Sequence, residues 1–304
     1  MSDQIRKKRS RFRWSDAYLY LIPWAIGVLV FRLWPFIEAF RISTQVRRVG
    51  RPTQNVGFAN FQEIIFENTM NGNMFRDSFW ATMRYVLITV PLVLVVALFV
   101  AFILNFKIKG IGFFRTSFYI PSILGGSVSI GLLWRAVFND TGLVNSFIGI
   151  LGIEPVGWLT TSSMALISIA LLRAWQFGSV MLIFLSALQN VPISLYEAAS
   201  VDGAKKWRQF FTITIPMITP TILFNTINIL VGAFQEFNAP FLVFSDLGGP
   251  NQSALLMNLF IYNRAFAANN FGVASAASWI MFVVIMILAL VIFKFSDKYV
   301  FYND

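Results

Sequence analysis

The stretch "LYEAASVDGAKKWRQFFTITIP", residues 195–216, is short, charged and glycine-containing, yet it separates two long apolar segments of the chain. Ser194 immediately precedes it, and Glu197 follows three residues later, which is the spacing of a capping box at the start of a helix. Asp202 and Gly203 then interrupt this helix, with Gly203 as the hinge, and basic residues open a second one. The pattern predicts a small helix pair that projects from the apolar part of the protein.

One face of the first short helix carries only small or apolar side chains, because Leu195, Ala198 and Ala199 fall at helical spacing. Two adjacent alanines let the backbone of another protein approach closely, and Glu197 offers a charge for pairing. On composition alone, the same pattern is equally well explained as a plain turn between two membrane-spanning helices. The choice between these interpretations depends on the rest of the sequence.

The composition of the chain is that of a membrane protein. Of its 304 residues, 57% are hydrophobic and 12% are charged, whereas a soluble globular domain has about 25% charged residues. The sequence contains no cysteine and no histidine, which excludes disulfides, thiolate metal sites and cysteine nucleophiles and removes the commonest proton shuttle. No Gly-Lys dipeptide occurs, so a Walker-type ATP-binding loop is absent. We therefore expect a polytopic, non-catalytic membrane protein that binds no metal or cofactor itself.

Six apolar segments are long enough to cross a bilayer, whose hydrocarbon core of about 30 Å requires about 20 helical residues. They cover residues 17–40, 79–104, 114–138, 164–188, 212–235 and 272–295. Prolines within or at the ends of several segments predict kinked helices whose freed carbonyls are satisfied by neighbouring helices. We expect an all-α integral membrane protein, with a basic tail at residues 1–16 and a six-helix membrane domain at residues 17–304.

Lysine and arginine residues near the segment ends define the expected orientation. A basic run from Arg6 to Arg13 precedes the first segment, and an even number of spans returns the C-terminus to the same side. Lys107, Lys109 and the loop at about residues 190–211 also fall on this side, so both termini are predicted to be cytoplasmic. The first segment is long and lacks a small-residue cleavage site, which favours a retained anchor over a signal peptide. The net positive charge thus reflects membrane topology, and nucleic-acid binding is not indicated.

Four arginines depart from this charge bias and gather in the first external loop. They are Arg41, Arg47, Arg48 and Arg51. One explanation is a solvated loop in which they pair with Glu63, Glu67 or lipid phosphates. The other is a docking surface for an acidic partner, or an attractive entrance for an anionic solute. The sequence leaves both explanations open.

The stretch at residues 195–216 resembles the EAA signature of ABC-importer permeases, and this resemblance removes the interpretation as a plain turn. The signature has a glutamate, two alanines, aspartate-glycine-alanine after two residues, then a phenylalanine and a hydrophobic-x-hydrophobic-proline end. The matching residues are Glu197, Ala198, Ala199, Asp202, Gly203, Ala204, Phe210, Ile213, Ile215 and Pro216. The family usually carries leucine where this chain has Ile215.

Other stretches resemble the carbohydrate branch of these permeases, the maltose-type and glycerol-phosphate-type, so the resemblance covers nearly the whole chain. "AYLYLIPWAIGVLVFRLWPF" (residues 17–36) is similar to the first span of that branch. "YIPSILGGSVSIGLLWRAVFNDTGLVN" (residues 119–145) is similar to its segment that ends in tryptophan and a Gly-Leu-x-Asn loop. "FLVFSDLGGPNQSA" (residues 241–254) resembles its Gly-Gly-Pro external loop, although the family's threonine before this loop is not reproduced at Ser245 and Asp246.

The resemblance implies a type I ABC importer permease fold in a bacterial cytoplasmic (inner) membrane. It also implies an assembly whose subunits have separate functions. A second, similar permease would complete the pathway, and two ATPase subunits would bind ATP and Mg and receive the EAA loop. An extracytoplasmic binding protein would deliver a sugar or oligosaccharide. The ATPase-coupling residues that the resemblance implies are Glu197, Ala198, Ala199, Asp202, Gly203 and Ala204.

Polar side chains in two predicted spans are candidates for the solute pathway. In the fifth span they recur at steps of four, three, four and three along one helical face: Thr221, Asn225, Asn228, Gly232 and Gln235. Side-chain amides both donate and accept hydrogen bonds, which suits sugar hydroxyls. Glu236, near the outer end, is a candidate gate or binding-protein contact, and the fourth span adds Arg173, Trp175 and Gln176. The alternative for the stripe is hydrogen bonding between neighbouring helices.

Two other functions are poorly supported by the sequence. An ion-coupled secondary transporter needs carboxylates or histidines deep in the membrane, but Glu38 and Glu236 both lie towards span ends. An intramembrane enzyme needs a catalytic pair at that depth, and the spans contain none. A permease of the same type for an anionic solute, such as glycerol phosphate or an acidic oligosaccharide, stays open, and the external arginines favour it slightly.

Overall fold

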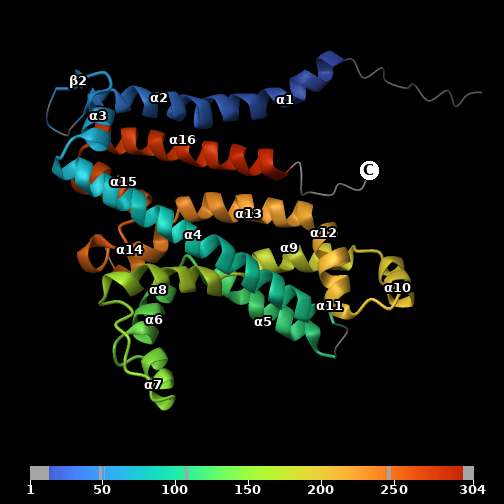
Figure 1. Ribbon diagram of the computed structural model, residues 1–304. Coiled ribbons are helices and arrows are strands. Elements are labelled where there is room, and N and C mark those ends of the chain that lie inside the picture. The colour runs from blue at the N-terminus through green and yellow to red at the C-terminus, as the bar shows by residue number, and fades with distance from the viewer. Residues whose placement is uncertain (1–13, 48–49, 51, 107–108, 245–247, 297–304) are drawn as a thin grey trace, which may run out of the picture.

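The computed structural model describes residues 14–47, 50, 52–106, 109–244 and 248–296, and helices make up almost all of it (Figure 1). The strands in this part of the chain, β1 (Gln45–Val46) and β2 (Gln54–Asn55), form one small antiparallel ribbon. The prediction of a helical membrane protein is therefore confirmed, with this ribbon as an addition. Several predicted features lie outside the described residues: residues 1–13 of the basic tail, Arg48, Arg51, Lys107, Ser245 and Asp246.

Three helical segments are long and apolar enough to cross a membrane on their own. The first combines α1 (Trp14–Val28), the π-helical turn η1 (Leu29–Leu33) and α2 (Trp34–Ser43); the other two are α4 (Met70–Leu104) and α16 (Phe271–Ser296). They correspond to the first, second and sixth predicted spans. α4 begins at Met70 rather than at residue 79, because the Thr69 hydroxyl caps it by accepting a hydrogen bond from the Gly72 amide at 3.1 Å.

The other three predicted spans are helix pairs with sharp bends of 104°, 49° and 66°, in chain order. The first pair is α5 (Ile111–Leu124) and α6 (Val128–Phe138), which is followed by α7 (Leu143–Ile150). The second pair is α8 (Ser162–Trp175) and α9 (Gly178–Gln189). The third begins with α11 (Lys206–Gln209), η2 (Phe210–Thr214) and α12 (Ile215–Met217) and ends with α13 (Thr219–Phe234). By length and composition, the described residues thus contain three helices that could cross a membrane, or up to six candidate spans if each bent pair is one span.

Glycines rather than prolines mark two of these bends. Gly125 and Gly126 separate α5 from α6, whereas Pro121 stays inside α5. At the start of α9, Gly178 packs so closely on α5 that a Cβ atom there would lie 2.6 Å from the carbonyl oxygen of Phe118. The third bend lies between two prolines, where a kink was expected. A criterion of apolar length alone does not detect the two glycine-dependent breaks.

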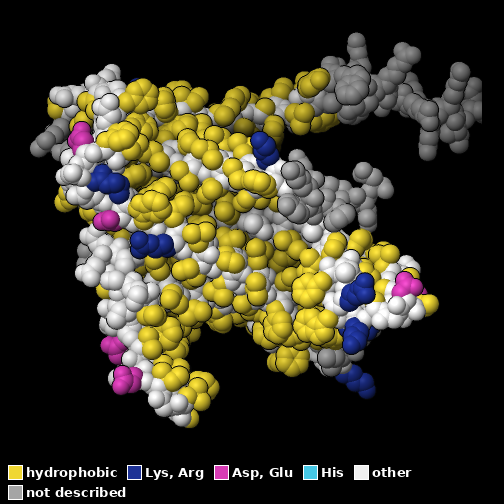
Figure 2. Space-filling view, in the orientation of Figure 1, with side chains coloured by type: hydrophobic (Ala, Val, Ile, Leu, Met, Phe, Trp, Pro, Cys, Tyr) yellow, Lys and Arg dark blue, Asp and Glu magenta, His cyan; other side chains and the backbone are white. Residues whose placement is uncertain are grey.

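The centre of the packed core is α4. Its inward face carries small residues, including the fully buried Ala97 and Ala101, and α8, α9 and α13 pack against it. A smaller cluster at one end of the molecule joins Phe75 of α4 to Phe260 and Val273. By contrast, η1 has no buried residue, and Figure 2 shows hydrophobic side chains over most of the middle of the molecule. Such a surface suits lipid tails or further subunits.

The elements divide between two opposite ends of the molecule (Figure 1). At the right end of the view lie α10 (Ile193–Val201), α11, the start of α1 and the end of α16. At the left end lie the β-ribbon, α3 (Ala59–Phe66), α14 (Asn238–Phe244) and α15 (Met257–Tyr262). The right end thus gathers the segments that the sequence predicts to be cytoplasmic. We call it the α10 end, and the opposite one the ribbon end.

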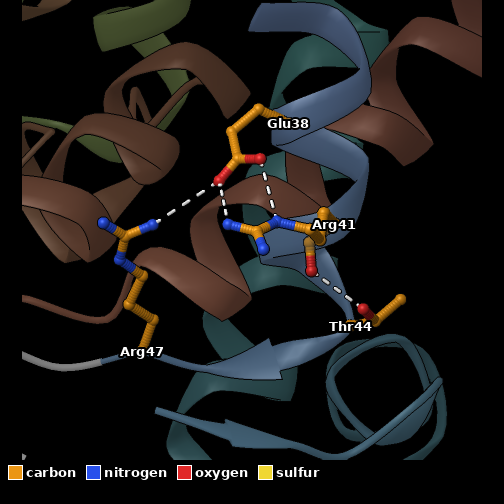
Figure 3. A network of polar contacts seen from close by, with 4 residues as sticks. All are labelled: Glu38, Arg41, Thr44 and Arg47. Carbon is orange, nitrogen blue, oxygen red and sulfur yellow. Dashed lines mark hydrogen bonds and ion pairs between the residues drawn. The ribbon is translucent and has the colours of Figure 1, made fainter.

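The arginines of the predicted external loop that the structure describes pair with a residue of their own segment. Arg41 donates to the Glu38 carboxylate from Nε at 2.9 Å and from Nη2 at 2.7 Å, and Arg47 Nη1 lies 3.8 Å from the same carboxylate (Figure 3). The expected partners, Glu63 and Glu67, form no ion pair within the described part of the chain. The predicted pairing with Glu63 and Glu67 is therefore wrong for Arg41 and Arg47, because α2 extends to Ser43 and presents Glu38 beside both arginines. It stays a prediction for Arg48 and Arg51, which lie outside the described residues.

Candidate functional site

The EAA segment forms an exposed helical knob at the α10 end. We use the word knob for residues 193–209, which contain α10 and α11. No residue of α10 is buried, and Val201 at its end is 88% exposed. Glu197 and Ala198 are exposed as well. The Glu197 carboxylate has no hydrogen-bond or ion-pair partner in the described part of the chain.

The predicted capping box is wrong. α10 begins at Ile193, with Pro192 in the N-cap position and no side-chain hydrogen bond to the helix start. Pro192 has a non-helical conformation and Ile193 is the first helical residue, so Ser194 lies inside the first turn and not at the N-cap position. The charge of Glu197 thus has no capping partner at Ser194, and its role can be tested without unravelling a capping box.

The predicted hinge at Gly203 is confirmed. Gly203 has a left-handed φ of +74°, which glycine adopts without strain. Its amide donates to the Ser200 carbonyl at 3.1 Å, and the Ala204 amide donates to the Ala199 carbonyl at 2.9 Å. This pair of bonds is the Schellman motif, which satisfies the last carbonyls of a helix and reverses the chain. The EAA spacing therefore encodes a defined turn that fixes α11 relative to α10.

A buried glutamine, missed in the sequence, locks this turn. Gln209 is 2% exposed, and its Nε2 donates to Ser200 Oγ at 2.9 Å and to the Ala204 carbonyl at 3.0 Å. Tyr196 and Thr214 add a hydroxyl–hydroxyl hydrogen bond of 2.8 Å between α10 and η2. A glutamine between charged and aromatic residues gave no signal of burial. The knob is thus internally rigid while its Glu197–Ala198 surface stays exposed.

A second candidate site is a polar cleft of about 140 Å³ where three helix breaks meet. Its lining residues are Ser122, Gly125, Gly126, Leu172, Arg173, Gln176, Glu236, Asn238 and Ala239. They come from the α5–α6 break, the α8–α9 break and the connection from α13 to α14 (Asn238–Phe244). Broken helices expose backbone carbonyls and amides that an unbroken helix would use itself. The structure thus brings together Arg173, Gln176 and Glu236 from two predicted spans.

Hydrogen bonds place the long side chains of the cleft. Arg173 Nη1 donates to Gln176 Oε1 at 3.2 Å, and Gln176 Nε2 donates to the Gly125 carbonyl at 3.1 Å. Glu236 Oε1 accepts a hydrogen bond from the Ala239 amide at 3.0 Å. Arg173 and Glu236 line the same cleft but form no ion pair within the described residues. The cleft therefore offers separated donors and acceptors, which suit a ligand with many hydroxyl groups.

The polar stripe of the fifth predicted span lies beside this cleft. α13 holds Thr221, Asn225 and Asn228 in one unbroken helix, and Gln235 caps its end. A Cβ atom at Gly232 would lie 3.6 Å from Arg173 Nη2, so the stripe and the cleft are neighbours. Asn225 is 1% exposed, whereas Asn228 and Gln235 are exposed. The stripe therefore follows the border between the buried and exposed faces of α13.

Hydrogen bonding between helices, the alternative role of the stripe, occurs at Gln235, whose carbonyl accepts a hydrogen bond from Asn258 Nδ2 of α15 at 2.6 Å. The side-chain amides of Asn225 and Asn228 show no such bond among the described residues. Asn225 Nδ2 has no hydrogen-bond partner in the described part of the chain, and Asn228 Nδ2 donates to Phe224 of its own helix at 2.7 Å. Trp175 does not line the cleft, because its ring packs against Trp134 with centroids 6.0 Å apart. Contact of any of these residues with a solute stays a prediction.

Comparisons with known proteins identify the family of the chain. Residues 64–301 match the family described as "Binding-protein-dependent transport system inner membrane component". The chain is 38% identical over 305 residues to the probable ABC transporter permease protein YesP of Bacillus subtilis (strain 168), covering 100% of this chain and 97% of that protein. It is 31% identical to the lactose transport system permease protein LacF of Rhizobium radiobacter, with 95% and 96% covered.

The fold is also that of a solved transporter chain. A crystal structure of a bacterial alginate ABC transporter, in complex with its alginate pentasaccharide-bound periplasmic protein, contains a chain that matches this one with a TM-score of 0.74. The sequence identity is 22%, and 93% of this chain and 94% of that chain are covered. Family match, relatives and fold agree over most of the sequence, and the chain belongs to the family of binding-protein-dependent transport system inner membrane components.

Proposed function

We propose that this chain is a permease subunit of an ATP-driven importer and forms half of a pathway for a sugar or oligosaccharide. The observation that carries the proposal is the knob: its backbone is fixed by the Gly203 turn and Gln209, while Glu197 and Ala198 remain exposed. A partner subunit that binds this rigid projection, with its exposed Glu197 charge, would move the helices that are connected to the knob. The relatives named as permeases of sugar transport systems support the same function.

The proposed assembly has four other parts. They are a second, similar permease, two ATPase subunits that bind ATP and Mg, and an extracytoplasmic binding protein that delivers the solute. In this arrangement the chain is not itself an enzyme, and ATP hydrolysis takes place on the partner ATPases. The exposed apolar side chains of the first helical segment are consistent with a surface that faces lipid or the second permease.

We further propose six spans with both termini in the cytoplasm of a bacterial cell and the permease domain in its inner membrane. Each bent helix pair then counts as one span. The start of α1, the end of α16 and the knob lie at the same end of the molecule, which supports this orientation (Figure 1). Lys205, Lys206, Lys109 and Lys294 then follow the expected bias of positive charge towards the cytoplasm.

Coupling runs through the two helices that flank the knob. α9 begins beside Gln176 in the polar cleft and leads to the knob, and α11, η2 and α12 lead from the knob into α13, which ends beside Glu236 in the same cleft. A displacement of the knob by closing ATPases therefore reaches two walls of the cleft. ATP binding would favour one arrangement of these walls and hydrolysis the other.

A neutral sugar is the favoured solute. The external arginines are the feature that favours an anionic solute, but Arg41 and Arg47 share the carboxylate of Glu38 (Figure 3). Paired charges attract an anion less strongly than unpaired ones. The cleft contains one arginine and one glutamate, so its formal charges balance. Hydrogen bonding rather than net charge would select the solute there.

The proposed function is tested by reconstitution. The permease pair, the ATPases and the binding protein encoded with them are purified and placed in liposomes, and ATP hydrolysis is measured with the binding protein alone, loaded with neutral saccharides, and loaded with acidic ones. We expect hydrolysis and uptake to rise with a loaded binding protein and to require both ATP and Mg. Uptake driven by an ion gradient without ATP would contradict the proposal.

Single cysteines in this cysteine-free chain test the polar stripe. Cysteine at Asn228 or Gln235 is expected to react with a water-soluble thiol reagent, because amides facing hydrocarbon would cost up to several kcal/mol. Cysteine at the buried Asn225 is expected to react more slowly and to differ most between nucleotide states. Cysteines at Ile222 and Leu223 are the matched controls on neighbouring positions. Reaction at the two controls with inert stripe positions would place the pathway on another face of α13.

A further inference from the structure

A second polar cleft opens at the ribbon end of the molecule. It has a volume of about 280 Å³ and lies between the start of α4, the 3₁₀ turn η4 (Pro250–Gln252) and the π-helical turn η5 (Asn263–Ala267). Its lining residues are Met74, Gln252, Leu255, Asn263, Arg264, Ala267 and Ala268. None of them belongs to the polar cleft at the helix breaks. We call it the Arg264 cleft, after its charged residue.

Arg264 is buried in this cleft and forms no ion pair with a carboxylate of the described residues. It is 7% exposed; its Nη1 donates to Asn71 Oδ1 at 2.8 Å and its Nη2 to Met74 Sδ at 2.6 Å. Its Nε has no hydrogen-bond partner among the described residues, and the Phe260 ring covers the guanidinium at 5.4 Å. Glu63 is connected to it through Asn71, whose Nδ2 donates to Glu63 Oε1 at 2.7 Å.

The described neighbours satisfy only some of the N–H donors of the Arg264 guanidinium. Burial lowers the pKa of Arg264 and the charge of Glu63 raises it, but an arginine keeps its positive charge at physiological pH. A guanidinium has five N–H donors, of which the described neighbours accept two, one of them through a weak sulfur acceptor. A buried cation is stable only when an anion or several hydrogen bonds compensate it. Phe260, Asn71 and the nearby charge of Glu63 compensate this cation only in part, and a carboxylate, which arginine binds through two parallel hydrogen bonds, would complete the compensation.

We propose that the Arg264 cleft receives an acidic side chain of the extracytoplasmic binding protein and thereby fixes its docking position. The inference rests on the proposed importer function. The Gly-Gly-Pro loop shapes the mouth of the cleft: Asn251 and Gln252 have left-handed φ values of 51° and 58°, and Gln252 lines the cleft beside Arg264. The small side chains of Ala267 and Ala268 allow close approach from the other side.

A docked protein fits this position better than the transported solute. η5 follows α15, which lies at the ribbon end, opposite the knob (Figure 1). The cleft shares no residue with the one that joins α9 and α13, so a solute that occupied it would bypass the helices connected to the knob. A carboxylate supplied by the binding protein would instead act before the solute enters.

In the test, increasing concentrations of the purified binding protein are added to the complete complex in lipid nanodiscs, and the rate of ATP hydrolysis is measured. Arg264→Gln is expected to raise the half-saturating concentration of binding protein about ten-fold, a larger change than in the maximal rate. Arg264→Lys keeps the charge but loses the planar fork, so a rise of about three-fold is expected. The difference between wild type and Arg264→Gln should shrink at high salt. Arg76→Gln, which removes the charge of a half-buried arginine on the same end of α4 that does not line the cleft, is the matched control and should leave half-saturation unchanged.

The outcomes separate the inference from the proposed function. If the binding protein does not stimulate wild-type ATP hydrolysis at all, the importer function itself fails. If it stimulates the wild type and both Arg264 variants with the same half-saturation, the docking inference is overturned. It is also overturned if the Arg264 variants change only the preference for acidic over neutral saccharides at saturating binding protein, because the carboxylate then comes from the solute. If Arg264→Gln does not assemble, the half-saturation and salt response of Arg264→Lys decide.

Discussion

Gly203→Pro is expected to abolish solute-stimulated ATP hydrolysis and uptake while the permease still reaches the membrane. Gly203 has a φ of +74°, and its amide donates to the Ser200 carbonyl at 3.1 Å. Proline fixes φ near about −65° and has no N–H, so it can satisfy neither requirement. The turn would open, the Ala204 amide would lose the Ala199 carbonyl, and α11 would no longer hold its place against α10. The ATPases would then move a loose segment instead of the helices that lead to the cleft.

Gly203→Asn is the matched control for this prediction. Asparagine tolerates the left-handed conformation better than other side chains, and a Cβ atom at this position would meet no atom within 4 Å. We expect this variant to retain most of its stimulated hydrolysis, measured in proteoliposomes at equal membrane levels. If Gly203→Pro keeps wild-type stimulation, the knob is not the coupling element. If both variants lose it equally, the backbone argument for the turn is wrong.

Gly125→Ala is expected to lower solute uptake about ten-fold by displacing one side chain of the polar cleft. A Cβ atom at Gly125 would collide with the amide of Gln176, at 2.6 Å from its Oε1. Gln176 is the end of a flexible side chain, so it can move and leave the fold intact, but it would lose its bonds to the Gly125 carbonyl and to Arg173. The variant should therefore show nearly unchanged thermal stability and a raised half-saturating solute concentration.

The neighbouring glycine provides the control for the cleft. A Cβ atom at Gly126 would lie 3.6 Å from Asn238 Nδ2, which is ordinary van der Waals contact. Gly126→Ala should therefore transport at close to the wild-type rate. Uptake by purified complexes in liposomes, with solute concentration varied, measures both variants. Equal losses in the two variants would mean that the bend itself, and not Gln176, matters, whereas normal uptake in Gly125→Ala would remove this cleft from the pathway.

The sequence predicted the membrane class, the helical fold and the hinge of the knob correctly. Length and polarity were sufficient to find α4 and α16, and the Asp-Gly pair was sufficient to place the turn at Gly203. These features depend on local composition and on backbone conformations that few residues other than glycine adopt easily. The family resemblance, which the match over residues 64–301 confirms, came from the same local spacing.

Features that depend on long-range packing were not predictable. The breaks at Gly125 and Gly178 arise where α5, α8 and α9 approach each other, and a single apolar segment gives no signal of such an approach. Gln209 and Arg264 look like ordinary surface residues in the sequence, but tertiary contacts bury both. The capping box at Ser194 was a valid local pattern, but the helix starts earlier, at Ile193, with Pro192 as its N-cap residue. The cleft itself combines residues more than 100 positions apart, such as Gly125 and Glu236.

The central claim is that the knob is the surface that an ATPase subunit contacts. Site-specific photo-cross-linking in intact membranes tests it most directly. A photoreactive amino acid is placed at Ala198 on α10, and a matched one at Phe66, which is 78% exposed on α3 at the opposite end of the molecule. Cross-linked products are identified by mass spectrometry with and without ATP. We expect the probe at residue 198 to cross-link an ATPase subunit, with a yield that depends on nucleotide, and the probe at residue 66 to give no such product. An ATPase product from residue 66, or none from residue 198 in a complex that hydrolyses ATP normally, would contradict the account.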